Sequence, residues 1–454
     1  MLIRAKKVDA TNGKLIPLIV SFIIPLVLTT LLQQLFNAVD IAVLGNMADT
    51  RAVAAVGATT TIVHLIIDAF VGIASGAKIV FSRLVGKNDE TELRRSIDTS
   101  IVLAIGFGLI VSTIGITLSP LFMNWVDCPA EVFDDAVMYI RIYLLSAPAI
   151  LLYNYGSAVL TSSGDTQRPL YYAMASGLLN VVLNIILCLI LPRKVAAVAI
   201  ATAAAQVLAA VLVMLRLCHM DGIMRVQIKK IRFNFKSCMQ LLRFGVPLSL
   251  QTLIYPLGSL QIVSAINSHG IACMAGNSAA STVEQLIAAF RTAFGASTAT
   301  FMGQNLGADK PDRVKKSFWY NVWIILAVNF TVSMTALFTN EYWMQIFLKD
   351  DIAALEYALI RNDILMSVTV IATMNVVLGS AIQAFGYPIW STVNCLLWVL
   401  GLRIVWMAFV YPHFSTYANL IICFAVSWLC TMLCNIVIIS VIYTRYKKGK
   451  YRRI

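Results

Sequence analysis

Residues 24–57 read IPLVLTTLLQQLFNAVDIAVLGNMADTRAVAAVG, an apolar run of helix length in which the carboxylate of Asp40 lies deep inside. A charged side chain in hydrocarbon costs several kcal/mol, so such a residue is generally retained for a function. We therefore predict that Asp40 binds a partner ion. The less specific explanation is a structural ion pair with an interior Arg or Lys.

The chain around this run has the composition of a polytopic membrane protein. Hydrophobic residues make up 59% of the 454 residues and charged residues 13%, with a mean hydropathy of +0.81. A soluble chain of this length with this composition would have to expose too many apolar side chains to water. The opening MLIRAKKVDATNGK leads into an apolar run too long for a cleavable signal peptide, so this run is expected to remain as a helix.

At roughly 20 residues per crossing, about twelve membrane-spanning helices are expected. They are predicted at residues 15–46, 52–82, 97–121, 133–162, 169–192, 195–217, 240–268, 271–303, 317–340, 353–385, 388–412 and 416–444. Several are longer than a bilayer requires, which predicts tilt, protruding ends or bends at proline. The prolines inside these runs include Pro25, Pro148, Pro247 and Pro256.

The basic residues are distributed asymmetrically between the two sides of this topology. Of 35 Lys and Arg residues, 26 fall on one side, four on the other and five within the spans. The positive-inside rule then predicts that both termini are cytoplasmic. This orientation accounts for the net charge of +13 without a nucleic-acid partner. The nine scattered cysteines show no C-x-x-C pair and are interpreted as packing residues.

A basic segment divides the chain into two similar halves. We predict an N-terminal six-helix lobe (1–217), a basic cytoplasmic linker (218–239) and a C-terminal six-helix lobe (240–454). Corresponding features recur at offsets of 219 to 222 residues, and they are Pro25 and Pro247, Gly86 and Gly307, Ser96 and Ser317, Arg141 and Arg361, and Pro169 and Pro388. Because each half has about six helices, the repeats are parallel, and the binding site is expected between them.

Several sequence motifs lie in or next to these predicted helices and are considered as one set. They are the opening stretch, SGDTQRP at 163–169, NVVLN at 180–184, GQNLGADKPDRVKKS at 303–317, and AFGYP with RIVW at 384–388 and 403–406. In these motifs and over nearly its whole length, the chain resembles the MATE (multidrug and toxic compound extrusion) transporters, in their bacterial DinF-like or MepA-like branch. The resemblance implies an all-α membrane protein with two pseudo-symmetric six-helix bundles in a V, which exports organic cations in exchange for Na⁺ or H⁺.

The resemblance also implies a coupling site in the N-terminal lobe. By motif, the residues that would bind Na⁺ or H⁺ are Asp40, Asn180, Asn184 and Thr202. Some relatives carry Asp at the position of Asn184. Because this chain has Asn there, Asp40 is the one carboxylate among the four residues. We further expect that neutralising Asp40 bends or repacks the first helix around Pro25, its predicted hinge.

Spacing supports this set independently of the resemblance. Asn180 and Asn184 are four residues apart and share one helix face. At roughly 1.5 Å per residue, all four side chains lie in the outer half of their helices. A carboxylate with amide and hydroxyl oxygens suits a hard cation such as Na⁺, and a desolvated carboxylate also suits a proton. Either coupling ion remains open.

Three other charged residues lie within predicted spans. Glu284, Asp68 and Arg403 are candidates for a substrate site or a second cation site, in which Glu284 would attract a cationic substrate. The alternatives are that Asp68 neutralises a nearby base such as Lys78 and that Arg403 is structural. Arg403 occupies the repeat position of Asn184.

These observations predict a secondary active multidrug exporter, expected as a monomer in the bacterial inner membrane. It would be a transporter and not an enzyme, with no cofactor, because no Walker motif, nucleophile elbow or metal-ligand cluster is found. One alternative is a lipid-linked precursor flippase of the same fold superfamily. Another is an integral membrane enzyme or sensor.

Overall fold

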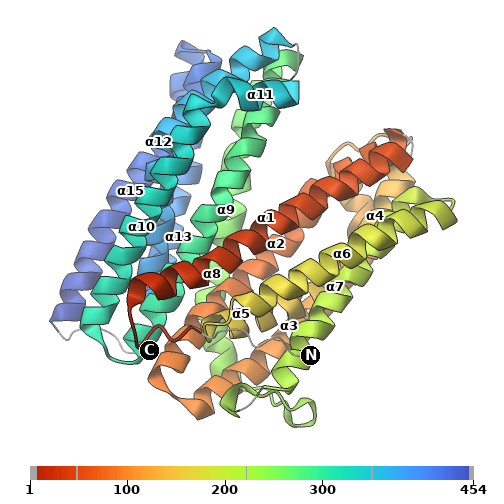
Figure 1. The fold of residues 1–454 in the computed structure, drawn as a ribbon. Coiled ribbons are helices and arrows are strands. Elements are labelled where there is room, and N and C mark those ends of the chain that lie inside the picture. Colours follow the sequence, from red (N-terminus) through yellow and green to blue (C-terminus); the bar gives the residue numbers. More distant parts are fainter. Residues whose placement is uncertain (1–7, 48–49, 221, 349–350, 449–454) are drawn as a thin grey trace. The chain divides into compact units, whose positions relative to one another are not determined.

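The computed structural model describes residues 8–47, 50–220, 222–348 and 351–448, and helices dominate this part of the chain (Figure 1). The described residues form two compact units. The first contains residues 8–10 and 20–249, and the second contains residues 11–19 and 250–448. Some of the basic residues counted for topology, such as Arg4, Lys349 and Arg452, lie outside the described residues.

The helices up to residue 230 are α1 (Leu15–Met47), α2 (Thr50–Lys87), α3 (Glu90–Trp125), α4 (Phe133–Leu145), α5 (Ala147–Ser162), α6 (Gln167–Ile190), α7 (Lys194–Cys218) and the short η1 (Gly222–Met224) and η2 (Ile228–Lys230). Next come α8 (Phe235–Ser268), α9 (Ile271–Gly307), α10 (Pro311–Phe338), α11 (Asn340–Leu348) and α12 (Ile352–Ala384). The last group is α13 (Pro388–Cys395), η3 (Leu396–Gly401), α14 (Leu402–Val405), η4 (Trp406–Val410), η5 (Tyr411–His413) and α15 (Tyr417–Lys447). The segments η3 and η4 are wide π-helical turns within one continuous span.

Most of these helices have the length and composition of membrane spans. Within the described residues, ten helices are long and apolar enough to cross a bilayer, and the bent pair α4 and α5 makes an eleventh. Helix α9 has 37 residues but is rich in Ala, Thr, Gly and Ser and is not among them. The chain is thus a multi-pass helical membrane protein.

The predicted span at 133–162 is a bent pair of helices. Helices α4 and α5 meet at Ser146 with a bend of 43°. Pro148 has no N–H to donate to the carbonyl of Leu144, four residues earlier. The hydroxyl of Ser112 on α3 donates to that carbonyl instead, at 2.7 Å. A neighbouring helix therefore satisfies the backbone group that proline leaves free.

The two halves share the geometry of their turns. Asn88 and Asp309 are separated by the repeat offset, and both have φ = 54°. The amide of the following residue bonds five residues back in each case, from Asp89 to Leu84 at 3.2 Å and from Lys310 to Asn305 at 3.0 Å. The predicted repeat is therefore visible in the backbone.

The boundaries of the units differ from the predicted lobes. The first half of α8 belongs to the first unit, because it packs tightly on α2. A Cβ at Gly72 would lie 2.5 Å from the Cα of Ser249, so two backbones approach as only a glycine permits. Residues 11–19, which include the first turn of α1, belong to the second unit. There, Nζ of Lys310 donates to the carbonyl of Thr11 at 2.9 Å.

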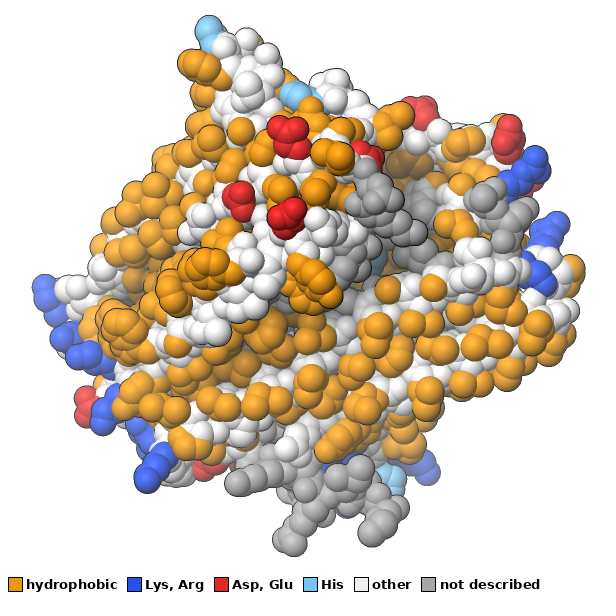
Figure 2. Space-filling model, turned by 45° about the horizontal axis from the view of Figure 1, so that its top comes forward, with side chains coloured by type: hydrophobic (Ala, Val, Ile, Leu, Met, Phe, Trp, Pro, Cys, Tyr) orange, Lys and Arg blue, Asp and Glu red, His pale blue; other side chains and the backbone are white. Residues whose placement is uncertain are grey.

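Helix α6 shows how these helices are arranged for lipid. Its exposed face carries large apolar residues such as Leu178 and Leu189, with exposed fractions of 64% and 70%. Its buried face includes the polar side chains of Asn180 and Asn184. Figure 2 shows the same pattern more widely, with rows of hydrophobic side chains over the helix surfaces. Polar groups inside and apolar groups outside are expected where the surrounding solvent is hydrocarbon.

Candidate cation site

The four side chains predicted as the coupling site are joined in one chain of hydrogen bonds. Nδ2 of Asn184 donates to Oδ1 of Asp40 at 2.5 Å and lies 3.4 Å from Oδ1 of Asn180. Nδ2 of Asn180 donates to the Thr202 hydroxyl at 3.3 Å, and that hydroxyl donates to the carbonyl of Val198 at 3.0 Å. Helices α1, α6 and α7 thus meet at a polar centre that we call the Asp40 site.

Helix α6 supplies its two amides because of its residue spacing. Its buried residues are Pro169, Leu170, Ala173, Gly177, Asn180, Asn184 and Cys188, which form one stripe at intervals of three and four. Gly177 lies on this stripe, where an added Cβ would overlap the ring of Phe36 on α1. Phe36 is one helical turn before Asp40. The absence of a side chain at Gly177 therefore lets α1 approach α6 closely enough for Asp40 to reach Asn184.

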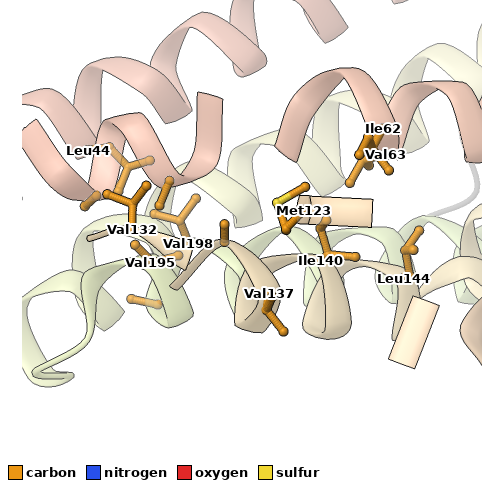
Figure 3. Packing of buried hydrophobic residues seen from close by; sticks show 14 of the residues in the cluster. Leu44, Ile62, Val63, Met123, Val132, Val137, Ile140, Leu144, Val195 and Val198 are labelled. Carbon is orange, nitrogen blue, oxygen red and sulfur yellow. The ribbon is translucent and has the colours of Figure 1, made fainter. Parts of the chain in front are cut away.

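An apolar layer covers the Asp40 site on one side. Leu44 lies one turn after Asp40, Cys188 one turn after Asn184, and Val198 one turn before Thr202. All three are buried members of the same hydrophobic cluster. Figure 3 shows Leu44 close to Val132 and Val198 in this cluster. The cluster restricts access of water to the polar centre along the helix axes. Low dielectric there strengthens each hydrogen bond and each interaction with an ion.

The charge of Asp40 is not balanced by a base. Among the described residues, no Lys or Arg forms a salt bridge with Asp40, which argues against the structural ion pair considered above. Oδ1 of Asn184 is buried and has no hydrogen-bond partner among the described residues. A buried acceptor without a partner is costly unless a donor or a cation reaches it. The site therefore has a carboxylate and an amide oxygen available for a proton or a small hard cation.

Pro25 lies within α1 without ending the helix. The hydroxyl of Thr29 donates to the carbonyl of Pro25 at 2.7 Å, so a side chain competes for the backbone at this point. Proline and such hydroxyl bonds both weaken the regular helical ladder. The hinge role of Pro25 stays a prediction.

The other three predicted residues lie outside the Asp40 site. Asp68 is on the exposed side of α2, one turn after His64. Glu284 on α9 is bound by two arginines, with 2.8 Å to Nη2 of Arg361 and 3.6 Å to Nη2 of Arg291. Their predicted roles in binding substrate or a second cation stay predictions.

Arg403 is buried on α14 and has neutral partners. Its Nε and Nη1 donate to the hydroxyls of Ser427 and Ser259 at 3.3 and 3.1 Å. Arg291 and Arg361, which bind Glu284, were not among the site residues predicted from the sequence. One signal would have linked Arg291 to Glu284: they are seven residues apart and therefore share a face of α9.

Comparisons with known proteins agree with this geometry. The family model described as MatE matches residues 25–186 and again residues 247–409, which supports the internal repeat. The chain is 22% identical to the probable multidrug resistance protein YoeA of Bacillus subtilis, covering 87% of this chain and 86% of that protein. It is 21% identical to the multidrug export protein MepA of Staphylococcus aureus, covering 83% of each.

Solved structures show the same fold. A crystal structure of MATE in complex with MaL6 has a TM-score of 0.89 and 19% identity, covering 98% of this chain and all of that one. A MOP superfamily transporter from Pyrococcus furiosus, described as having a binding pocket of reverse polarity, has a TM-score of 0.88 and 19% identity, covering 98% and 99%.

Proposed function

The chain belongs to the MatE family of multidrug efflux transporters, and from this premise we propose that it exports organic cations from the bacterial cytoplasm in exchange for Na⁺ or H⁺ bound at the Asp40 site. Family members are transporters and not enzymes, so the energy for export comes from a coupled ion. We place the protein in the inner membrane with both termini cytoplasmic, as the distribution of its basic residues indicates.

The observation that carries this proposal is the unbalanced carboxylate beside an amide oxygen without a partner. In the described arrangement, Asn184 donates to Asp40, as expected for an ionised carboxylate. A proton on Asp40 would convert that group into a donor, for which Oδ1 of Asn184 is an acceptor. A sodium ion would instead draw oxygens of Asp40, Asn180 and Asn184 toward itself. Both ions change the bonds that join α1 to α6.

Such a change couples ion and drug only if they favour different conformations. An ion that bound both conformations equally would shift nothing, however tightly it bound. We propose that ion binding repacks α1, through the segment around Pro25 and Thr29, and thereby lowers affinity for the drug. Exchange of ion for drug then follows from this difference in affinity.

The proposal is tested with the purified protein in liposomes. Efflux of ethidium is followed by fluorescence under an inward-directed Na⁺ gradient, an inward-directed proton gradient, or neither. We expect either the Na⁺ gradient or the proton gradient to accelerate efflux at least tenfold over the control without a gradient. Equal rates in all three conditions would contradict coupled export.

A further inference from the structure

The second unit contains a buried charged centre that the proposed exchange does not use. Both carboxylate oxygens of Glu284 face guanidinium groups, Oε2 toward Arg361 and Oε1 toward Arg291. Arg361 also donates to Asn277 at 2.8 Å, and Arg291 donates to Thr369 at 3.1 Å. Helices α9 and α12 provide these groups.

Arg403 extends this centre from α14. Its guanidinium carbon lies 4.3 Å from the centroid of the Phe424 ring, and that of Arg361 lies 5.6 Å from the same centroid. Both arginines therefore lie against one aromatic ring. We call Arg291, Arg361, Arg403 and Glu284 the arginine cluster.

The arginine cluster has an excess of positive charge. Within the described part of the chain, Arg403 forms no salt bridge, and Glu284 is the one carboxylate that pairs with the other two arginines. Asp363, also on α12, accepts a hydrogen bond from Asn340 instead. Two guanidinium groups thus share one carboxylate, and the third, that of Arg403, is paired with none.

Burial makes this excess costly. Arg403 is 2% exposed and Arg361 is 7% exposed, and both lie on helices that are membrane spans. Nε of Arg361 is buried and has no hydrogen-bond partner among the described residues. A guanidinium in such a place is normally paired or hydrogen-bonded at each donor. The unused donor and the unbalanced charge are both features that binding of an anion would satisfy.

We propose that the arginine cluster binds the oxyanion group of a small solute, a carboxylate or a phosphate, and that Glu284 occupies the guanidinium groups when this anion is absent. Arginine's planar fork of donors suits carboxylate and phosphate oxygens, and binding there would complete the pairing of Arg361 and Arg403. This goes beyond export of cations, because a solute carrying both charges, or only a negative one, would then be recognised.

A purely structural network makes a different prediction. In that case Glu284 would serve to hold α9 against α12, and removing its charge would weaken the protein without creating affinity for anions. If Glu284 competes with a solute anion, removing its charge leaves three guanidinium groups without a carboxylate. The affinity for an added anion then rises.

Trp428 provides a reporter for the test. Its ring lies 6.0 Å from the guanidinium carbon of Arg291, so an anion at the cluster will change its fluorescence. The purified full-length protein is titrated with benzoate, with inorganic phosphate and with phosphatidylglycerol vesicles, using phosphatidylcholine vesicles as the lipid control. Trp428→Phe identifies the part of the signal that comes from this position. A saturable response to benzoate or phosphate is expected, whereas a response to phosphatidylglycerol alone would overturn a solute site and assign the bound oxyanion to a lipid headgroup.

Variants then locate the response. We expect Arg403→Gln to weaken anion binding at least tenfold and Glu284→Gln to tighten it at least threefold. Arg141→Gln, at the repeat position of Arg361 but exposed and bonded to Ser119, is the matched control and should bind like the wild type. Absence of any saturable response in the wild type, or unchanged affinity in both Arg403→Gln and Glu284→Gln, would overturn the proposal. Neither result bears on ethidium export driven by the Asp40 site.

Discussion

Nδ2 of Asn184 donates a hydrogen bond of 2.5 Å to Oδ1 of Asp40, a residue 144 positions away in the sequence. This bond connects the helix that contains Pro25 to the helix that contains the amide pair. A single exchange of proton or sodium ion at Asp40 acts on this connection directly.

Replacing Asp40 by Asn removes the one charge of the site while keeping its shape. We expect gradient-driven efflux of ethidium to fall at least tenfold, because the amide neither ionises nor attracts a cation strongly. Binding of the dye, measured by fluorescence polarisation, should be retained. Asn46→Ala, an exposed change on the same helix, is the control. Undiminished ion-driven efflux by Asp40→Asn would refute the coupling role.

Replacing Asn184 by Asp places a second carboxylate next to Asp40. Two adjacent carboxylates do not both ionise readily, so the variant should hold an additional proton near neutral pH. We expect its efflux to depend more steeply on an imposed pH gradient than that of the wild type. Efflux rates at a series of external pH values measure this. A pH profile identical to the wild type would show that position 184 does not take part in ion binding.

Replacing Gly177 by Ala forces a methyl group against the ring of Phe36. We expect a loss of stability of about 1–3 kcal/mol, as for other overpacked contacts, together with slower ion-driven efflux because α1 moves away from α6. Thermal unfolding in detergent gives the stability. Gly106→Ala, where an added Cβ meets nothing within 4 Å, is the control and should be neutral. Phe36→Leu combined with Gly177→Ala should recover part of the loss, and a double variant no better than Gly177→Ala would contradict this steric explanation.

Asp89 makes the start of α3 sensitive to acid. Its hydrogen bond with Lys87 and its acceptance of the Glu92 amide hold the pKa of Asp89 below its ordinary value. A group whose pKa is lowered by folding stabilises the protein above its unfolded pKa and loses this effect as the pH falls through the folded value. Asp89→Ala should therefore cost about 1 kcal/mol at neutral pH, as for other lost N-caps. The difference in melting temperature from the wild type should shrink in acid, and a difference that is constant with pH would contradict the assignment.

Much of the fold could be predicted because hydrophobic length and the placement of basic residues are local properties. The span at 133–162 was predicted as one helix, and Pro148 marked a bend. The break at Ser146 also depends on the Ser112 hydroxyl of another helix, which the local sequence does not reveal. The unit boundaries were likewise set by a contact, between Gly72 and Ser249.

The residues of the Asp40 site could be selected from motif and spacing, but their meeting could not. It depends on the fit of Phe36 against Gly177, two residues without any chemical signature. Glu284 and Arg403 of the arginine cluster were candidates from the sequence, but Arg291 and Arg361 were missed for a related reason. Arg361 and Glu284 are 77 positions apart in the sequence. From sequence alone, an arginine that pairs inside a bundle cannot be distinguished from one whose side chain extends to the membrane surface.

The wide turns η3 and η4, on either side of Arg403, have no counterpart in the regular helix α6. Widened turns of this kind usually originate from an inserted residue and often persist at functional positions. A substitution that is informative in one half is therefore a poor guide to its equivalent in the other. Asn184 and Arg403 occupy equivalent repeat positions, but one is an amide in a regular helix and the other is a cation in a distorted helix. The two halves therefore share a scaffold but differ in the chemistry of their buried polar groups.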